Sequence, residues 1–295
     1  MWMRGLVRTI IIVISSSLLS VSLFAASLFT SAGVLAFSSA DSLQQLIALG
    51  ANINEEDKYG ETAIIHALRN NLDYQAIEAM IRAGANLKVK SAEGATPLLI
   101  AAQFCSDTAI PDLLLRKGLS LSALDSQKFN ITMYAARNPE PKIISYFLKK
   151  GVSVNYQPFL GSTPLMHAAM YNPNPEVIKI LLKAKANIDA RNNMAFTALH
   201  LACQMNGNND VVKTLILSGA NINAINRDSW TPLMLRCMVF PEPDMIDWML
   251  RHGAIASKRN ATGETAYSLA DKHDSLHENQ AGLDILKRLK QAARR

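Results

Sequence analysis

Four titratable side chains near the C-terminus have the spacing of metal ligands. His273 and His277 stand four residues apart, beside Asp274 and Glu278. Residues four apart share one face of a helix, so both imidazoles could reach one ion there. The stretch 271–280 is strongly polar, however, which favours a solvated loop. We therefore expect no metal to bind here.

The rest of the chain lacks the patterns that carry catalysis. It has no Gly-rich phosphate loop, nucleophile elbow or paired carboxylate motif, so we expect neither enzyme activity nor a cofactor. Cys105, Cys203 and Cys237 are too few and too widely spaced for a disulfide framework or a zinc site. The formal net charge of +6 falls to +4 without Arg4 and Arg8, and the basic residues form no stripe. A nucleic-acid partner is therefore not expected.

The N-terminus has the composition of a targeting segment. Arg4 and Arg8 precede an uncharged, largely apolar run, and small residues suited to a signal peptidase follow at 34–36 and 38–40. We interpret residues 1–40 as a signal peptide or a membrane anchor. If the segment is not cleaved, residues 9–37 would form a transmembrane helix; a buried helix is the third alternative. Both leading interpretations place the remainder across the membrane, in the periplasm or anchored on the periplasmic side of the inner membrane.

The remainder of the chain repeats every 34 residues, with one step of 33. Hydrophobic residues make up 49% of the sequence and charged residues 18%, as in folded proteins. Two anchor positions keep the same phase through seven copies, which chance does not produce. The first anchor comprises Thr62, Thr96, Asn130, Thr163, Thr197, Thr231 and Thr265. The second comprises Gly50, Gly84, Gly118, Gly151, Lys185, Gly219 and Gly253.

Each copy predicts two helices. Thr96-Pro97 indicates a capping residue followed by a proline in the first turn. The first turn tolerates proline because an N–H at that position would have no intrahelical partner. A second helix follows after a short loop and begins at its own cap, represented by Asp107 and Asn174. The glycine of the second anchor ends that helix in a left-handed conformation. The fold class is therefore all-α. Since Cys203 and Cys237 fill one slot on stacked helices, about 8–10 Å apart, they should be buried thiols rather than a disulfide.

These residues resemble those of ankyrin repeats. Thr197-Ala198-Leu199-His200-Leu201-Ala202 and the Gly-Ala-Asn-Ile-Asn turns at 50–54 and 219–223 carry the resemblance. It implies an ankyrin-repeat solenoid, with helix pairs joined by hairpin loops, over residues 41–295. We expect a half-repeat at 41–53, full repeats from about residue 54, and a C-terminal cap at about 258–295 whose last helix starts at Leu283.

The resemblance also implies where a partner would bind. Ankyrin arrays use the hairpin tips and the exposed side of the first helix, which together line a concave face. Large apolar side chains occupy these slots in the middle repeats, as at the centre of an interface. We expect Phe129 to fold inward instead, and for Phe159 the inward orientation is an open alternative. The predicted partner-binding residues are Phe104, Phe159, Leu160, Met170, Tyr171, Met194, Phe196, Met205, Trp230 and Met238.

We therefore expect an exported, monomeric and non-catalytic scaffold or adaptor that holds a protein or peptide partner on the concave face. Two alternatives stay open. The chain could be an inhibitor or immunity-type protein that masks a partner enzyme, or it could be a secreted effector. The partner's loss of activity on binding would indicate the inhibitor, and recovery of the chain outside the cell would indicate the effector.

Overall fold

The computed structural model describes residues 51–294, and the expected leader at 1–40 lies outside them. The described chain is helical, with an isolated antiparallel bridge between Glu56 and Thr62 in place of any strand. Its longest helix has 13 residues, and within the described part no helix could cross a bilayer.

The chain divides into two compact units between Ala135 and Ala136, inside helix α8. The described part of the first unit holds two helix pairs and most of α8. Its helices are α4 (Ala63–Arg69), α5 (Tyr74–Arg82), α6 (Pro97–Phe104), α7 (Ala109–Arg116) and α8 (Ile131–Arg137).

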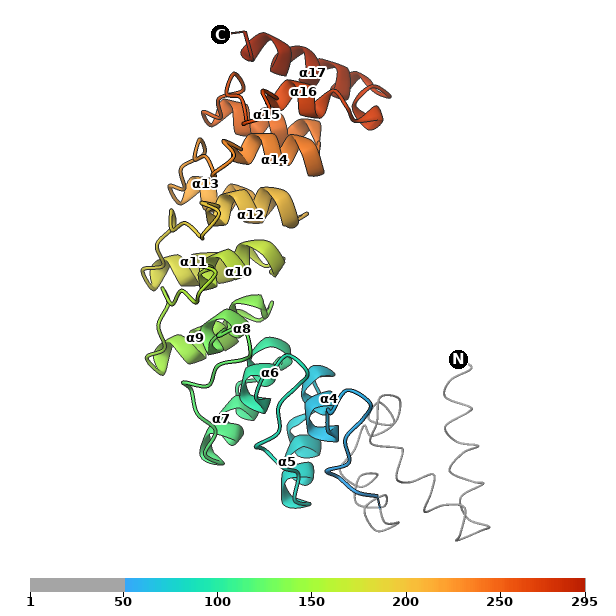
Figure 1. The fold of residues 1–295 in the computed structure, drawn as a ribbon, viewed down its shortest axis with the longest axis vertical. Coiled ribbons are helices and arrows are strands. Elements are labelled where there is room, and N and C mark those ends of the chain that lie inside the picture. The colour runs from blue at the N-terminus through green and yellow to red at the C-terminus, as the bar shows by residue number, and fades with distance from the viewer. Residues whose placement is uncertain (1–50, 295) are drawn as a thin grey trace, which may run out of the picture. The chain divides into compact units, whose positions relative to one another are not determined.

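The second unit continues the same alternation of first and second helices. Figure 1 shows α10, α12 and α14 stacked one above another, with α11, α13 and α15 in a row beside them. The helices are α9 (Pro141–Lys149), α10 (Pro164–Tyr171), α11 (Pro175–Lys183), α12 (Ala198–Met205), α13 (Asn209–Leu217), α14 (Pro232–Val239), α15 (Pro243–Arg251), α16 (Ala266–Ala270), the 3-10 turn η3 (Asp274–Leu276) and α17 (Gln280–Ala292).

The threonines of the first anchor from Thr96 onward cap the first helices, as the sequence predicted. The Thr163 hydroxyl accepts a hydrogen bond from the backbone N–H of Met166, at 3.2 Å. Asn130, which replaces threonine in its repeat, makes the equivalent bond to the N–H of Met133, also at 3.2 Å. Asparagine and threonine are both good caps because each offers a side-chain oxygen to an otherwise unpaired helical N–H. These capping bonds give the 34-residue repeat a structural cause at the starts of the first helices from α6 onward, whereas the Thr62 side chain makes no capping bond to α4.

Two predicted helix starts were wrong. α7 begins at Ala109, after Thr108, because the Asp107 carboxylate accepts the Ala109 N–H at 2.9 Å and forms a turn ahead of the helix. The last helix, α17, begins at Gln280 rather than Leu283, because Asn279 caps it by accepting the N–H of Gly282 at 2.9 Å.

The second anchor ends the second helices through a left-handed residue. Gly219 has φ +96°, and Lys185, which fills the same slot one repeat earlier, has φ +69°. A side chain is unfavourable in this conformation because its Cβ approaches the following carbonyl. The chain therefore carries local backbone strain at Lys185.

Asparagines at the ends of the first helices tie neighbouring repeats together in the second unit. The Nδ2 of Asn172 donates to the backbone oxygens of Ala136, at 2.9 Å, and Asn138, at 2.7 Å. One repeat later, the Nδ2 of Asn206 donates to Ala169 O at 3.1 Å and to Asn172 O at 2.8 Å. Each buried amide thus donates to two carbonyls of the preceding repeat. Buried backbone oxygens require such hydrogen-bond donors.

Phe240 interrupts this row, and a buried arginine completes it. Phe240 occupies the slot one repeat after Asn206, and it has no side-chain donor. Arg236 lies one turn earlier on α14 with its side chain fully buried, and its Nη1 donates to Asn206 O at 3.2 Å. Its Nη2 donates to Asn209 Oδ1 and lies 3.4 Å from a Glu242 oxygen. The guanidinium therefore supplies one of the two hydrogen bonds that an asparagine at 240 would have made, the one to Asn206 O.

Candidate protein-binding surface

The hairpin tips of the second unit expose large apolar side chains. Phe159 is 89% exposed, Leu160 is 56% exposed and Met194 is 49% exposed. Hydrogen bonds between successive tips set these residues in a row. The N–H of Asn193 donates to Leu160 O and the N–H of Arg227 donates to Met194 O, both at 3.2 Å. The tips therefore present neighbouring apolar groups that the fold itself does not cover.

A second apolar row lies at the carboxyl ends of the first helices. Tyr171 ends α10, Met205 ends α12 and Val239 ends α14. Tyr171 and Met205 are each about half exposed, and Val239 is 37% exposed. The first helices pack side by side, so these ends are neighbours (Figure 1). We call Tyr171, Met205 and Val239 the helix-end row. Because the hairpins precede the first helices and an eight-residue helix such as α12 is about 12 Å long, the row lies about one helix length from the hairpins.

Phe196 and Trp230 lie at the base of the hairpins and are half-buried. His200 holds them both. Its Nδ1 accepts the N–H of Thr197 at 3.1 Å, so the ring proton is on Nε2, which lies 3.0 Å from Trp230 O. The Phe196 ring meets the imidazole edge-on at 5.7 Å between centroids. This tautomer requires a neutral ring, and burial lowers the pKa of His200 to about 4. His200 thus positions the two aromatic residues that support the tips.

A cation holds Tyr171 in place within the helix-end row. The Nε and Nη2 of Arg137 donate to His167 Nδ1 at 3.0 and 2.8 Å, and the guanidinium carbon lies 4.9 Å from the centre of the Tyr171 ring. Burial, and then the charge of Arg137, lower the pKa of His167 to about 3. A neutral His167 can accept both hydrogen bonds. The cation–π contact therefore fixes the Tyr171 ring, while its outer part stays in solvent.

The repeat geometry agrees with a known family. A family model for ankyrin repeats, in three copies, matches residues 34–125, 70–158, 132–226 and 199–288. These overlapping matches cover most of the chain. The chain belongs to the ankyrin repeat family. No curated protein matches it.

Sequence reasoning on these ankyrin repeats placed most candidate residues at the surface, and the structure differentiates them. Phe159, which could have folded inward, is the most exposed of them, whereas Phe129 is buried, as expected. Met170 and Met238 are half-buried beside the exposed helix ends. Phe104 is 39% exposed at the end of α6, but it belongs to the first unit and is not assigned to the rows above.

Val239, in the row at the ends of the first helices of this ankyrin array, was missed by the sequence analysis. Val239 stands 34 residues after Met205, which itself stands 34 after Tyr171. The repeat spacing alone could therefore have identified it, since equivalent slots in a solenoid face the same way. The prediction took the neighbouring Met238 instead, as the residue that directly follows the position where other repeats have a pair of small residues.

The residues that could have carried chemistry have structural roles in the ankyrin fold. His273 Nε2 lies 2.8 Å from Met238 O, and His277 Nε2 lies 3.0 Å from Asp271 O. Residues 51–294 contain no group of three or more His, Cys, Asp or Glu side chains placed to hold a metal. Cys203 and Cys237 are buried thiols, as predicted, and burial raises the pKa of Cys203 to about 12.

Proposed function

We propose that this ankyrin array is a non-catalytic scaffold whose second unit holds an extended segment of a protein partner. The observation that carries the proposal is the exposure of Phe159, Leu160 and Met194 on consecutive hairpin tips. Ankyrin repeats suggest protein–protein interaction in general, and this apolar row supports a specific location for it. Burying one such side chain contributes roughly 1.5–3 kcal/mol, so several are needed to offset the cost of association.

The two rows suit a partner that carries apolar side chains at its contact points. The aromatic and methionine side chains provide contact area, and flexible methionines can adapt to partners of different contour. Tyr171 adds a fixed ring beside Arg137, with the ring face already occupied by the cation. A partner residue would therefore meet the ring's free side and edge.

The test is to replace Phe159 and Met194 by serine in the full chain. Phe159 is largely in solvent and Met194 is about half exposed, so the helical content and the melting temperature should not change. The partner is recovered by cross-linking in intact cells, affinity purification and mass spectrometry. Its recovery should fall at least about tenfold when both apolar side chains are lost. Undiminished recovery of the same partner would show that the hairpin tips are not the binding site.

The matched control replaces two exposed leucines outside both rows. Leu217 ends α13 and is 70% exposed, and Leu283 lies in α17 and is 46% exposed. Leu217→Ser with Leu283→Ser removes a similar apolar area, so partner recovery should stay at the unmutated level. The same purified complex distinguishes a scaffold from an inhibitor, because an inhibitor would abolish the partner's activity.

We further propose that the chain is exported and works in the periplasm, either free or anchored in the inner membrane. The support is the pair Arg4 and Arg8 ahead of the apolar run of residues 9–37. Cell fractionation with N-terminal sequencing tests this. A mature N-terminus near residue 37 or 41 indicates cleavage, an intact N-terminus in the membrane fraction indicates an anchor, and intact chain in the cytoplasm rejects export.

A further inference from the structure

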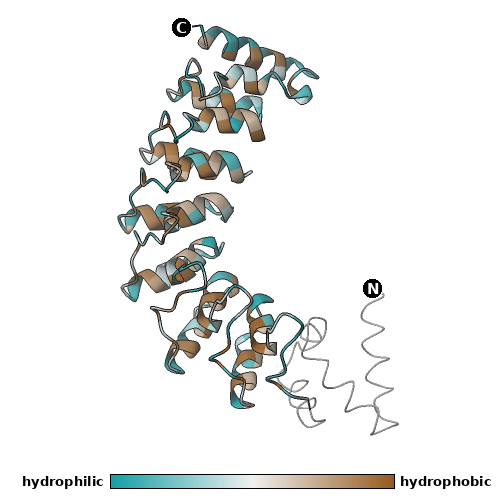
Figure 2. Cartoon of the chain, viewed as in Figure 1, coloured by the Kyte–Doolittle hydropathy of each residue, from teal (hydrophilic) through white to brown (hydrophobic). Residues whose placement is uncertain are grey.

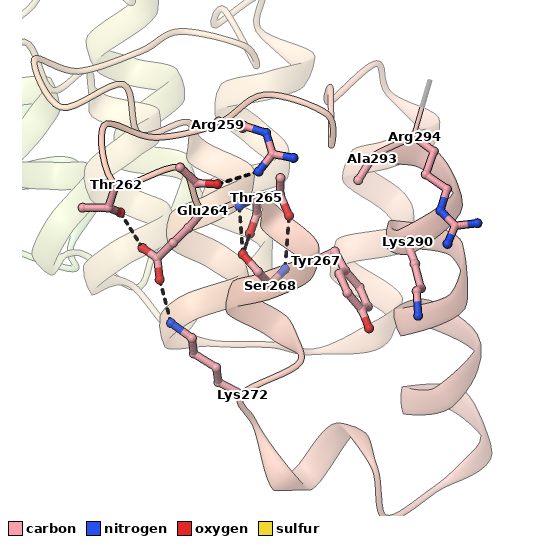
Figure 3. A pocket seen from close by; sticks show the side chains of 11 residues that line it. Arg259, Thr262, Glu264, Thr265, Tyr267, Ser268, Lys272, Lys290, Ala293 and Arg294 are labelled. Atoms are coloured by element: carbon pink, nitrogen blue, oxygen red, sulfur yellow. Dashed lines mark hydrogen bonds and ion pairs between the residues drawn. The ribbon is translucent and has the colours of Figure 1, made fainter.

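A hollow at the C-terminal cap is lined by eleven residues, of which four are basic and one is acidic. It has a volume of about 450 Å³ and lies between the stretch 259–272 and the last turns of α17. Figure 3 shows Arg259 on one side, Lys290 and Arg294 on the other, and Tyr267 between them. Lys272 and Glu264 also line it. These residues lie on elements other than the apolar rows.

The one carboxylate in this lining already has its partners. Glu264 accepts hydrogen bonds from Lys272 Nζ at 2.6 Å, Asn260 Nδ2 at 3.0 Å and Thr262 Oγ1 at 2.9 Å. Lys272 first, then Asn260 and Thr262, lower the pKa of Glu264 to about 2. Glu264 is therefore ionised at neutral pH, and its charge is matched by Lys272. The other basic residues of the hollow are not needed to neutralise it.

Three cations remain directed at the hollow. Arg259 Nη1 donates to Gly263 O at 2.7 Å, which fixes the guanidinium and leaves its other N–H groups available. Lys290 Nζ lies 5.5 Å from the centre of the Tyr267 ring, which holds the lysine head beside the hollow. Within residues 51–294, no carboxylate forms an ion pair with Arg259, Lys290 or Arg294. Four cations against one carboxylate give the lining a formal charge of +3.

We propose that this hollow binds a phosphate monoester, carried either by a side chain of a partner protein or by a small molecule. A dianion neutralises more of the +3 lining than a carboxylate does. Two guanidiniums can grip phosphate oxygens through paired N–H groups, and a lysine adds a compact charge. The volume falls within the range of small-ligand sites, so it accommodates the phosphate together with part of the group that carries it.

The experiment measures binding of a fluorescein-labelled Gly-Gly-phosphoserine-Gly-Gly peptide to the full chain by fluorescence polarisation. Lys290→Gln with Arg294→Gln should weaken binding by about tenfold, since two charge-assisted contacts are lost at an exposed site. The unphosphorylated peptide should bind at least about tenfold more weakly than the phosphopeptide. Free O-phosphoserine that competes at the concentration of the peptide's own Kd would identify a small-molecule source, and competition only by the peptide would identify a protein source.

The matched control is Lys183→Gln with Lys287→Gln. Both lysines are exposed, neither lines the hollow, and the net charge changes by the same amount. Binding to this control should stay within about twofold of the original. Arg259→Gln, on the opposite wall, should weaken binding independently of any effect on α17. Equal losses in the pocket and control pairs, or no preference for the phosphorylated peptide, would overturn the proposal.

Discussion

Acidification should destabilise the second unit through His167 and His200. Both rings are buried and neutral, with their pKa values lowered to about 3 and about 4. In the unfolded chain a histidine titrates near pH 6.5. Below that pH the unfolded state therefore binds protons that the native state does not. Their contribution to stability is complete above pH 6.5 and is lost as the pH falls towards 4.

The magnitude follows from the proton linkage. One proton taken up only by the unfolded state costs about 1.4 kcal/mol of unfolding free energy for each pH unit. Between pH 6.5 and 5.0 each histidine therefore loses about 2 kcal/mol, and the pair about 4 kcal/mol. The carboxyl groups with lowered pKa values, such as Glu264 and Asp57, titrate at lower pH in both states and do not contribute in this window.

Urea unfolding at pH 7.5 and 5.0 measures this loss, with the fluorescence of Trp230 and Trp248 reporting on the second unit. The double variant His167→Asn with His200→Gln should lose most of the pH dependence, because each amide retains one of the polar contacts without titrating. His252→Gln is the control, since His252 is exposed, and it should keep the full loss. A decrease below about 1 kcal/mol for the original chain, or an unchanged decrease in the double variant, would refute the reasoning.

Three further predictions test the fold. Arg236→Ala should lower the unfolding free energy by about 3 kcal/mol in a urea titration, because it opens a cavity and leaves Asn206 O unsatisfied; Arg236→Met, which keeps the volume, should cost less. Lys185→Gly should raise the unfolding free energy by about 1 kcal/mol in the same titration by relieving the left-handed backbone; a loss of stability would contradict this assignment. Cys203 and Cys237 should resist iodoacetamide in the native chain and react fully in urea, as peptide mass mapping would show.

The repeat could be predicted from sequence because its capping chemistry is local. Thr163 and Asn130 cap helices through a bond three residues along the chain, so a single copy contains the signal. The outward direction of Phe159 could not be predicted in the same way. It depends on the conformation of a hairpin tip that neighbouring repeats help to fix. For an apolar residue that can either cover the core or face solvent, the side-chain direction can be determined only from the three-dimensional structure.

The role of Arg236 illustrates the same limit. Its slot in the repeat otherwise holds small or apolar residues, and a charged residue there predicts exposure. It is buried because Phe240 replaces an asparagine four positions later and the carbonyl of Asn206 still requires a donor. Two substitutions that each break the pattern therefore compensate one another. Sequence inspection position by position does not reveal such a pair.

The row of asparagines determines where an additional repeat could be inserted into the array. Asn172 and Asn206 offer the same amide and reach the same carbonyls, so residues 173–206 could be duplicated and each copy would dock on the one before. At α14 the pattern changes, because the donor to Asn206 O is Arg236, and its guanidinium also contacts Asn209 of the preceding repeat and Glu242 of its own repeat. Gene duplication could therefore lengthen this protein in its middle far more readily than beyond α14.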